Sequence, residues 1–294
     1  MSTVRLAAAQ YDIGFFASWE EYAAKLSARV EEAAARAELL VFPEYGAMEI
    51  ASLLPAEVRA DLSAQIAGMQ DYLPRFLALH RDLARRHGVH LLAASFPSRA
   101  EDGRFHNRAH LFGPDGGMGY QDKLRMTRFE RESWQIAGGR GLRVFETALG
   151  RIGVAICYDA EFPLPVRQLV EAGAELILVP SCTDGLAGYH RVRIACQARA
   201  LENQCCVIQS PTVGEAPWSE AVDVNIGAAG IFVPPDRGLP DDGVLAVGTL
   251  NRSQWVYAEL DLDRLAAVRR NGQVLNHRDW PAQLDEQKVE RVPL

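Results

Sequence analysis

The stretch Arg151-Ile-Gly-Val-Ala-Ile-Cys157-Tyr-Asp159 runs from an apolar, β-branched segment into a cysteine and then into polar residues. Predicted strands alternate with predicted helices along this chain, so the strands are expected to be parallel and buried. In such sheets the reactive groups gather beyond the carboxyl ends of the strands. Cys157 lies at one of these ends, where a thiol is a candidate nucleophile. Most buried free cysteines are small apolar core residues, so Cys157 alone does not decide between the two roles.

Two other predicted strand ends carry groups that suit a nucleophilic thiol. The segment Glu38-Leu-Leu-Val-Phe-Pro-Glu44 ends at a carboxylate, and Gly119-Tyr-Gln-Asp-Lys123 ends at an ammonium group. Taken singly, each is more often an ordinary surface residue. The three groups have a joint meaning if they lie side by side. A carboxylate can accept the thiol proton, while a nearby cation lowers the pKa of the thiol and stabilises an oxyanion. The set of Glu44, Lys123 and Cys157 therefore favours acyl transfer.

These motifs resemble those of the nitrilase superfamily of carbon-nitrogen hydrolases. Val41-Phe-Pro-Glu44, Asp122-Lys123 and the segment 150–163 occur in the order and approximate spacing of that family. The resemblance continues through 173–181 and 198–204, so it covers nearly the whole chain. It implies an α/β fold, namely a four-layer α-β-β-α sandwich of the nitrilase-like kind.

The resemblance also assigns roles to the three residues. Glu44 would be the general base, Lys123 would stabilise the tetrahedral intermediate, and Cys157 would be the nucleophile. The implied protein is an enzyme, a carbon-nitrogen hydrolase of the amidase or nitrilase type. It would cleave a non-peptide bond of amide or carbamoyl type in a small molecule, through a cysteine thioester, and release ammonia or an amine.

Many members of the family have a second glutamate shortly after the lysine. The segment Thr127-Arg-Phe-Glu130-Arg-Glu132-Ser-Trp134 offers two candidates. We favour Glu132 as the catalytic one, because a tryptophan follows it with one residue between, as in the family pattern Glu-Gly-Trp. Glu130 is kept as a candidate for substrate binding. The alternative is that both are surface acids paired with neighbouring arginines.

The residues after the nucleophile also have candidate roles. The peptide N–H of Tyr158 follows the thiol directly and is a natural oxyanion donor. By resemblance, Asp159 and Arg167 brace the turn around the nucleophile, although an ordinary ion pair between them would add little stability. The family pattern Phe-Pro-Glu becomes Phe162-Pro163-Leu164 here, which removes one expected structural ion pair. His190 is expected near the rim of the pocket.

Composition restricts the partners of the protein. The formal net charge of −7 and the lack of a lysine- and arginine-rich run argue against a nucleic-acid surface. No apolar run is long enough to span a bilayer, and the first ten residues look like a strand instead of a signal peptide. Five cysteines without CxxC spacing suit a reducing cytoplasm. No metal-ligand spacing, P-loop or GxGxxG motif occurs, so we expect a small-molecule substrate and no metal or cofactor.

Periodicity predicts how the chain is organised. Helices are expected at 18–37, at 55–87 with a break at Pro74, at 164–172 and at 187–204, whereas 211–226 lacks periodicity and is expected to be a loop. Strands are expected at the segments 90–96, 105–112, 142–145, 152–157, 176–179, 206–208, 228–233 and 255–260. No linker divides the chain, so we predict one domain over 1–294, with about fifteen residues of extended tail at its end. By analogy with the family, the chain would form a homodimer or a higher homo-oligomer through helices 164–172 and 187–204.

Several alternatives remain open at the level of sequence. An isochorismatase-like hydrolase uses a similar acid, lysine and cysteine set on another fold, but its acid is normally an aspartate. Acyl transfer to an amine, nitrile hydrolysis and a non-catalytic nitrilase-like scaffold are further possibilities. The substrate is not identified, because the pocket walls are expected to come from loops near 47–54, 125–140, 182–190 and 212–226.

Overall fold

The computed structural model describes residues 3–284 and 289–293, and its strands form one continuous sheet that folds into two halves. The order along this sheet is β4-β5-β3-β2-β1-β10-β9-β8-β7. The first half contains β1 (Thr3–Asp12), β2 (Leu39–Val41), β3 (His90–Leu92), β4 (Phe96–Arg99), β5 (Phe105–Phe112), β6 (Met118–Asp122) and β14 (Gln254–Asp261). The second contains β7 (Val144–Thr147), β8 (Gly150–Val154), β9 (Leu176–Ser181), β10 (Cys206–Glu215), β11 (Val224–Asn225), β12 (Gly230–Phe232) and β13 (Val244–Val247). The halves meet where β1 and β10 pair in parallel, at Tyr11–Thr212 and Asp12–Val213.

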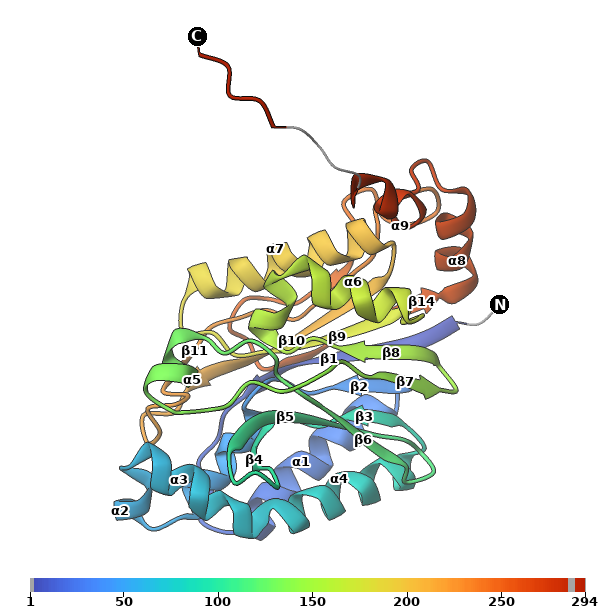
Figure 1. Ribbon diagram of the computed structural model, residues 1–294. Helices are drawn as coiled ribbons and strands as arrows, with labels where there is room; N and C mark the ends of the chain where they lie inside the picture. Colours follow the sequence, from blue (N-terminus) through green and yellow to red (C-terminus); the bar gives the residue numbers. More distant parts are fainter. Residues whose placement is uncertain (1–2, 285–288, 294) are drawn as a thin grey trace.

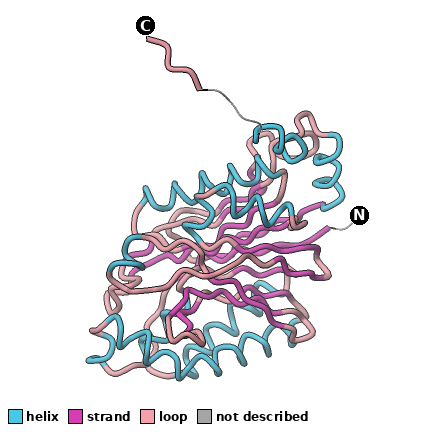
Figure 2. Tube along the Cα trace, viewed as in Figure 1, coloured by secondary structure: helices cyan, strands magenta, loops and turns pink. Residues whose placement is uncertain are grey.

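Helices cover the outer face of each half. Helices α6 (Pro163–Glu171) and α7 (Leu186–Asn203) lie above the strands in Figure 1, and α1 (Trp19–Ala34) and α4 (Leu73–His87) lie below them. Figure 2 shows the same order of layers, with helices outside and strands between them. The four-layer α-β-β-α prediction is confirmed.

Strand β1 explains how the layers are held together, because its two faces enter different cores. Val4, Leu6 and Ala8 belong to the core between the two halves of the sheet. Ala7 and Tyr11 point the other way, into the core between this half of the sheet and the helices α1 and α4. A strand alternates its side chains between the two faces of its sheet, so an almost wholly apolar strand requires cover on both.

The predicted helix at 18–37 is present as α1, and its sequence signals act as expected. Ser18 is the N-cap, and its side chain accepts the backbone N–H of Glu21. The buried side chains follow helical spacing, and they are Tyr22, Leu26, Val30 and Ala33. The helix therefore buries one face against the sheet and leaves the opposite face to solvent.

Two predictions of secondary structure need correction. The segment 55–87 is divided into α2 (Ala56–Arg59), α3 (Leu62–Met69), η2 (Gln70–Tyr72) and α4, and Pro74 lies in the first turn of α4. Proline is tolerated there because the N–H of a first-turn residue has no helical partner, so Pro74 begins a helix and does not break one. The predicted loop 211–226 is partly strand, since β10 continues to Glu215 and pairs with β11.

The end of the described chain differs from the predicted tail. After α8 (Leu262–Asn271) and α9 (Asn276–Asp279), a short 3-10 helix spans Trp280–Leu284. Residues 289–293 have no regular structure and are exposed, while the rest of the predicted tail lies outside the described residues. No helix within 3–284 or 289–293 is long and apolar enough to cross a membrane.

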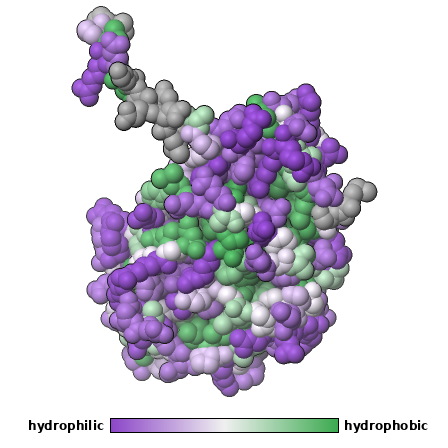
Figure 3. Space-filling model, turned by 45° about the vertical axis from the view of Figure 1, so that its right-hand side comes forward, coloured by the Kyte–Doolittle hydropathy of each residue, from purple (hydrophilic) through white to green (hydrophobic). Residues whose placement is uncertain are grey.

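Some apolar side chains on the outer helices are exposed to solvent. They include Leu164 on α6 and Ile194 and Leu201 on α7. Figure 3 shows apolar residues gathered around the middle of one face, between hydrophilic regions at its two ends. Assembly into a homo-oligomer through α6 and α7 stays a prediction.

Candidate active site

Cys157 lies directly beyond the carboxyl end of β8, as the sequence predicts. The backbone N–H of Ala155 still bonds to β9 through Leu178, and the 3-10 helix η3 (Cys157–Glu161) begins at the cysteine. Cys157 has a positive φ of 48°, which is a sparsely populated conformation for a residue other than glycine. Strain of this kind persists when the surrounding structure enforces it, and it is frequent at functional sites. The turn places the thiol 3.8 Å from the carbonyl oxygen of Cys182, which directly follows β9.

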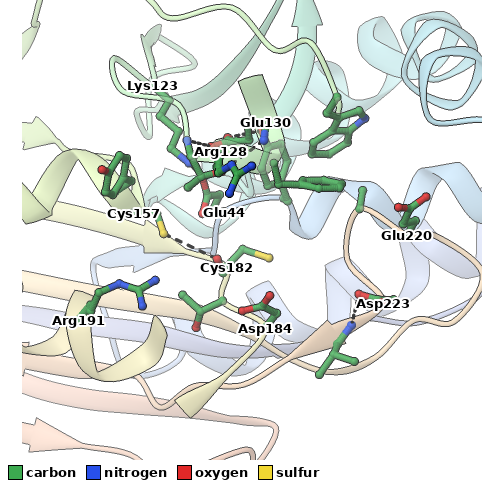
Figure 4. Close-up of a pocket in the computed structure, with 18 of the residues that line it drawn as sticks. Glu44, Lys123, Arg128, Glu130, Cys157, Cys182, Asp184, Arg191, Glu220 and Asp223 are labelled. Atoms are coloured by element: carbon green, nitrogen blue, oxygen red, sulfur yellow. Dashed lines mark hydrogen bonds and ion pairs between the residues drawn. The ribbon is translucent and has the colours of Figure 1, made fainter. Parts of the chain in front are cut away.

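Glu44 and Lys123 come from the other half of the sheet and meet in front of this thiol. Glu44 follows β2 and Lys123 follows β6, and both side chains are only 1% exposed. The Lys123 Nζ atom lies 2.7 Å from Oε1 of Glu44. Figure 4 shows both residues close to Cys157. The structure therefore brings together the three residues that the sequence selected.

Glu130 is the second carboxylate at this site. Lys123 Nζ lies 2.6 Å from its Oε2 atom, and the hydroxyl of Tyr45 donates to its Oε1 atom at 2.7 Å. Glu130 belongs to α5 (Arg128–Glu132), whose N-cap Thr127 forms a capping box with it. This box turns the Glu130 side chain inward, toward the lysine.

Glu132 lies outside the cluster, which corrects our preference between the two glutamates. Its side chain is 48% exposed and pairs with Arg128 at 2.8 Å and with Arg131 at 3.4 Å. Successive helical residues are separated by about 100°, so positions 130 and 132 face nearly opposite sides of α5. The sequence carried a signal for the inward position of Glu130, because Thr127-Arg-Phe-Glu130 is a capping-box pattern.

Asn107 is a member of the cluster that the sequence analysis did not select. Its side-chain nitrogen donates to Glu44 Oε1 at 2.8 Å and to Glu130 Oε1 at 3.3 Å, and the residue is fully buried. Strand pairing places it there, since the Lys123 backbone N–H donates to the Asn107 carbonyl oxygen. A polar residue on a strand that is otherwise mostly buried was the available signal.

Asp159 braces the lysine loop, and it does so without Arg167. Its carboxylate accepts the backbone N–H groups of Leu124 and Arg125, the latter at 2.7 Å. Burial raises the pKa of Asp159 to about 6, although these N–H groups and Lys123 act against that rise. Arg167 instead pairs with Glu171 at 2.8 Å. The turn that begins at Cys157 and the loop that follows Lys123 are therefore tied directly together.

Burial and mutual charge set the protonation of the cluster. Burial raises the pKa of Glu44 to about 7, with Lys123 lowering it and Glu130 raising it further. For Glu130, the lysine and several hydrogen bonds outweigh burial, so its pKa lies below the usual range. Burial acts against the charge of Lys123, but the two carboxylates hold its pKa well above the usual range. Burial and the nearby Glu44 raise the pKa of the Cys157 thiol, so the resting thiol is neutral.

These residues form the inner wall of a cavity of about 610 Å³. Segments 125–140, 182–190 and 212–226 contribute to its walls as predicted, and Tyr158 lines it too. Two predictions about the rim are wrong. Residues 47–54 do not line the cavity, because most of η1 (Gly46–Leu53) is packed into the core. His190 is exposed and does not line it either.

The mouth of the cavity is rich in charged side chains. Arg191 lies 3.6 Å from Glu161, and Figure 4 shows Asp184, Glu220 and Asp223 on the side away from this arginine. Within the described residues, no group of three or more histidine, cysteine or acidic side chains is arranged to hold a metal ion.

An α-β-β-α sandwich with a buried cysteine, glutamate and lysine at its strand ends is the arrangement of a nitrilase-like protein. The sequence pattern of the carbon-nitrogen hydrolase family matches residues 5–270, so the chain belongs to this family of the nitrilase superfamily. The alternative of an isochorismatase-like hydrolase is therefore wrong.

Curated relatives cover the chain to different extents. A Bacillus subtilis (strain 168) protein named "Probable hydrolase YhcX" is 36% identical over 277 residues, which are 94% of this chain and 53% of that protein. A deaminated glutathione amidase of Yersinia enterocolitica is 34% identical over 53% of this chain and 60% of its own length. An omega-amidase of Danio rerio is 27% identical over 64% of this chain and 67% of its own length. The chain thus spans little more than half the length of the first two relatives.

Solved structures show the same fold. A carbon-nitrogen hydrolase from Helicobacter pylori superposes with a TM-score of 0.76 at 20% identity, covering 97% of this chain and 96% of that one. An amidase from Nesterenkonia sp., solved as a double mutant with acrylamide, has a TM-score of 0.67 at 22% identity. The superposition covers 95% of this chain and 98% of that one. At these identities the likeness concerns the fold alone.

Proposed function

We propose that this protein hydrolyses the carbon-nitrogen bond of a small amide through a thioester on Cys157. The observation that carries the proposal is the buried cluster of Glu44, Lys123 and Glu130 in front of the Cys157 thiol, which lies beyond the carboxyl end of β8. The relatives named as amidases support the same reaction.

The first half of the reaction forms the acyl-enzyme. Glu44 accepts the thiol proton while Sγ of Cys157 attacks the carbonyl carbon of the amide. Lys123 and the peptide N–H of Tyr158 stabilise the negative charge that develops on the substrate oxygen. The carbon-nitrogen bond then breaks, and the leaving nitrogen takes the proton from Glu44, so that ammonia or an amine departs.

The second half returns the enzyme to its starting state. Glu44, again ionised, takes a proton from water, and the resulting hydroxide attacks the thioester carbon. The bond from that carbon to Sγ breaks, the thiolate recovers a proton from Glu44, and the carboxylic acid leaves. In both steps Glu130 keeps Lys123 charged and in place, because its carboxylate is a second anionic partner of the ammonium group beside Glu44.

Amides and carbamoyl compounds are expected to be hydrolysed faster than nitriles. The site presents a base and an oxyanion-stabilising cation for a carbonyl group, and the relatives named above include amidases. Ammonia release from matched panels of amides, carbamoyl compounds and nitriles measures the preference. Intact-mass spectrometry during turnover would reveal the acyl adduct, and added hydroxylamine would show whether the acyl group also transfers to an amine. Ammonia from nitriles with none from any amide would contradict the proposal.

The rate is expected to rise with pH through a midpoint near 7. Glu44 must be ionised to accept a proton, and burial raises its pKa to about 7. Below that pH the protonated base is inactive, so kcat/KM should fall about tenfold for each further pH unit. The measurement is a pH profile of kcat/KM for the wild type, with Glu44→Gln as an inactive control. An acid limb centred near the ordinary glutamate value would show that Glu44 is not the titrating base.

A further inference from the structure

Glu44 receives two hydrogen bonds from nitrogen, and both arrive at the same oxygen. Lys123 Nζ lies 2.7 Å from Oε1, and Nδ2 of Asn107 lies 2.8 Å from it. Among the described residues, no nitrogen donor bonds to the second oxygen, Oε2. The Cys157 thiol is close enough to the Glu44 carboxylate that each group affects the pKa of the other. The two donors thus occupy one oxygen and leave the other for proton transfer.

Among the described residues, the side chain of Asn107 bonds to the two carboxylates and to no other group. Its Nδ2 atom also donates to Glu130 at 3.3 Å, whereas its own Oδ1 is buried without a hydrogen-bond partner. The amide is therefore held through its nitrogen alone. Only the nitrogen end of the amide can face two carboxylates without repulsion, because that end carries the donors.

We propose that Asn107 is a positioning residue for the general base, which holds Oε1 of Glu44 beside Lys123 and thereby presents Oε2 to the thiol of Cys157. The inference rests on the proposed function. Asn107 touches neither the substrate nor the sulfur, so it acts through Glu44.

The proposal has a consequence that a structural role would not have. An N–H donor stabilises an ionised carboxylate, so losing it raises the pKa of that carboxylate. The ionisable groups that act on Glu44 come from several elements, and they are Lys123 after β6, Glu130 on α5, Cys157 on η3, and Tyr45 and Cys182 in the adjoining loops. None of these groups changes when only Asn107 is replaced.

Two variants separate the charge effect from packing. Asn107→Leu removes the donor, and Asn107→Asp keeps the shape while adding a third acid beside Glu44 and Glu130. We expect the acid limb of kcat/KM to move to higher pH by about one unit in Asn107→Leu and further in Asn107→Asp. At pH 7, kcat should fall about tenfold or more, with little change in KM.

Asn203→Leu is the matched control. Asn203 is also fully buried, it also has an Oδ1 without a partner, and it bonds only to the Arg199 carbonyl oxygen near the end of α7. This variant should lower the melting temperature as much as Asn107→Leu does. Its pH profile should coincide with that of the wild type.

A second readout does not depend on any substrate. The rate at which iodoacetamide alkylates Cys157, followed by peptide mass spectrometry across pH, reports on the same base. In one outcome the wild type hydrolyses no amide, yet the acid limb of the pH profile of alkylation moves to higher pH in both Asn107 variants. The positioning role then stands and the proposed reaction fails. The role of Asn107 would be overturned, even in an active amidase, if the acid limb of the alkylation profile stayed at the wild-type pH in both Asn107 variants. An equal shift of that limb in Asn203→Leu would overturn it as well.

Discussion

Replacing Cys157 with alanine is expected to reduce amide turnover by about 10⁵-fold or more, because no thioester can form without the sulfur and loss of a nucleophile costs as much as loss of the whole catalytic set. The fold should survive, since the thiol makes only a long contact of 3.8 Å with the Cys182 carbonyl oxygen. Ammonia release under saturating substrate measures the loss, and thermal melting shows whether the variant is folded.

Cys182→Ala is the control for this experiment. Cys182 also lines the cavity, but its thiol lies 3.3 Å from Oδ1 of Asn225, and burial raises its pKa to about 12. The Cys157 thiol is neutral as well, but the Cys182 thiol donates to an amide oxygen, which cannot act as a general base. We expect Cys182→Ala to keep most of the activity. The assignment of the nucleophile would be wrong if Cys182→Ala were inactive and Cys157→Ala retained turnover.

Glu130→Gln is expected to lower kcat by about a hundredfold or more, since the charge that holds Lys123 in place contributes to stabilising the transition state. Among the described residues, the buried ammonium would keep Glu44 as its only anionic partner. The amide nitrogen would face either the hydroxyl donor of Tyr45 or the donors of Thr127, depending on which oxygen it replaces. Kinetics with a saturating amide separates the effect on kcat from any effect on KM.

Glu132→Gln is the matched control on the same helix. It removes ion pairs with Arg128 and Arg131 at an exposed position, and such pairs contribute about 0–1 kcal/mol. Its kcat should stay within about twofold of the wild type, because a surface substitution away from the site rarely affects the chemistry. Thermal melting of both variants excludes misfolding. The opposite ranking, with Glu132→Gln the more damaged variant, would restore the role to Glu132.

The sequence was informative wherever an apolar strand ended in a polar residue. Glu44, Lys123 and Cys157 were found because each follows such a strand, and because the sheet brings those ends to one edge. Glu132 was preferred to Glu130 because Trp134, two positions after Glu132, was weighed above the local capping box. That box decides which side of a short helix faces inward, whereas the spacing to Trp134 does not.

Asn107 was not selected, for a different reason. It belongs to the polar run His106-Asn107-Arg108 of β5, and a polar residue on a strand does not by itself indicate which residues it will contact. Its importance arises only when β5 pairs with β6 and the lysine that follows β6 is carried beside it. Contacts of this kind depend on register across strands, which one sequence does not specify.

The two halves of the sheet each hold part of the proposed catalytic set, and in the proposed mechanism this affects how the protein gains activity as it folds. Glu44 and Lys123 belong to the first half, and Cys157, which is 157 − 44 = 113 residues beyond Glu44, belongs to the second. Contacts between positions so far apart in sequence form slowly, because a long segment of chain must first be closed into a loop. A partly folded chain with only one half formed has either the base or the nucleophile, and it therefore has no activity. Turnover thus reports the docking of the two halves, whereas circular dichroism would report the earlier formation of helices and strands.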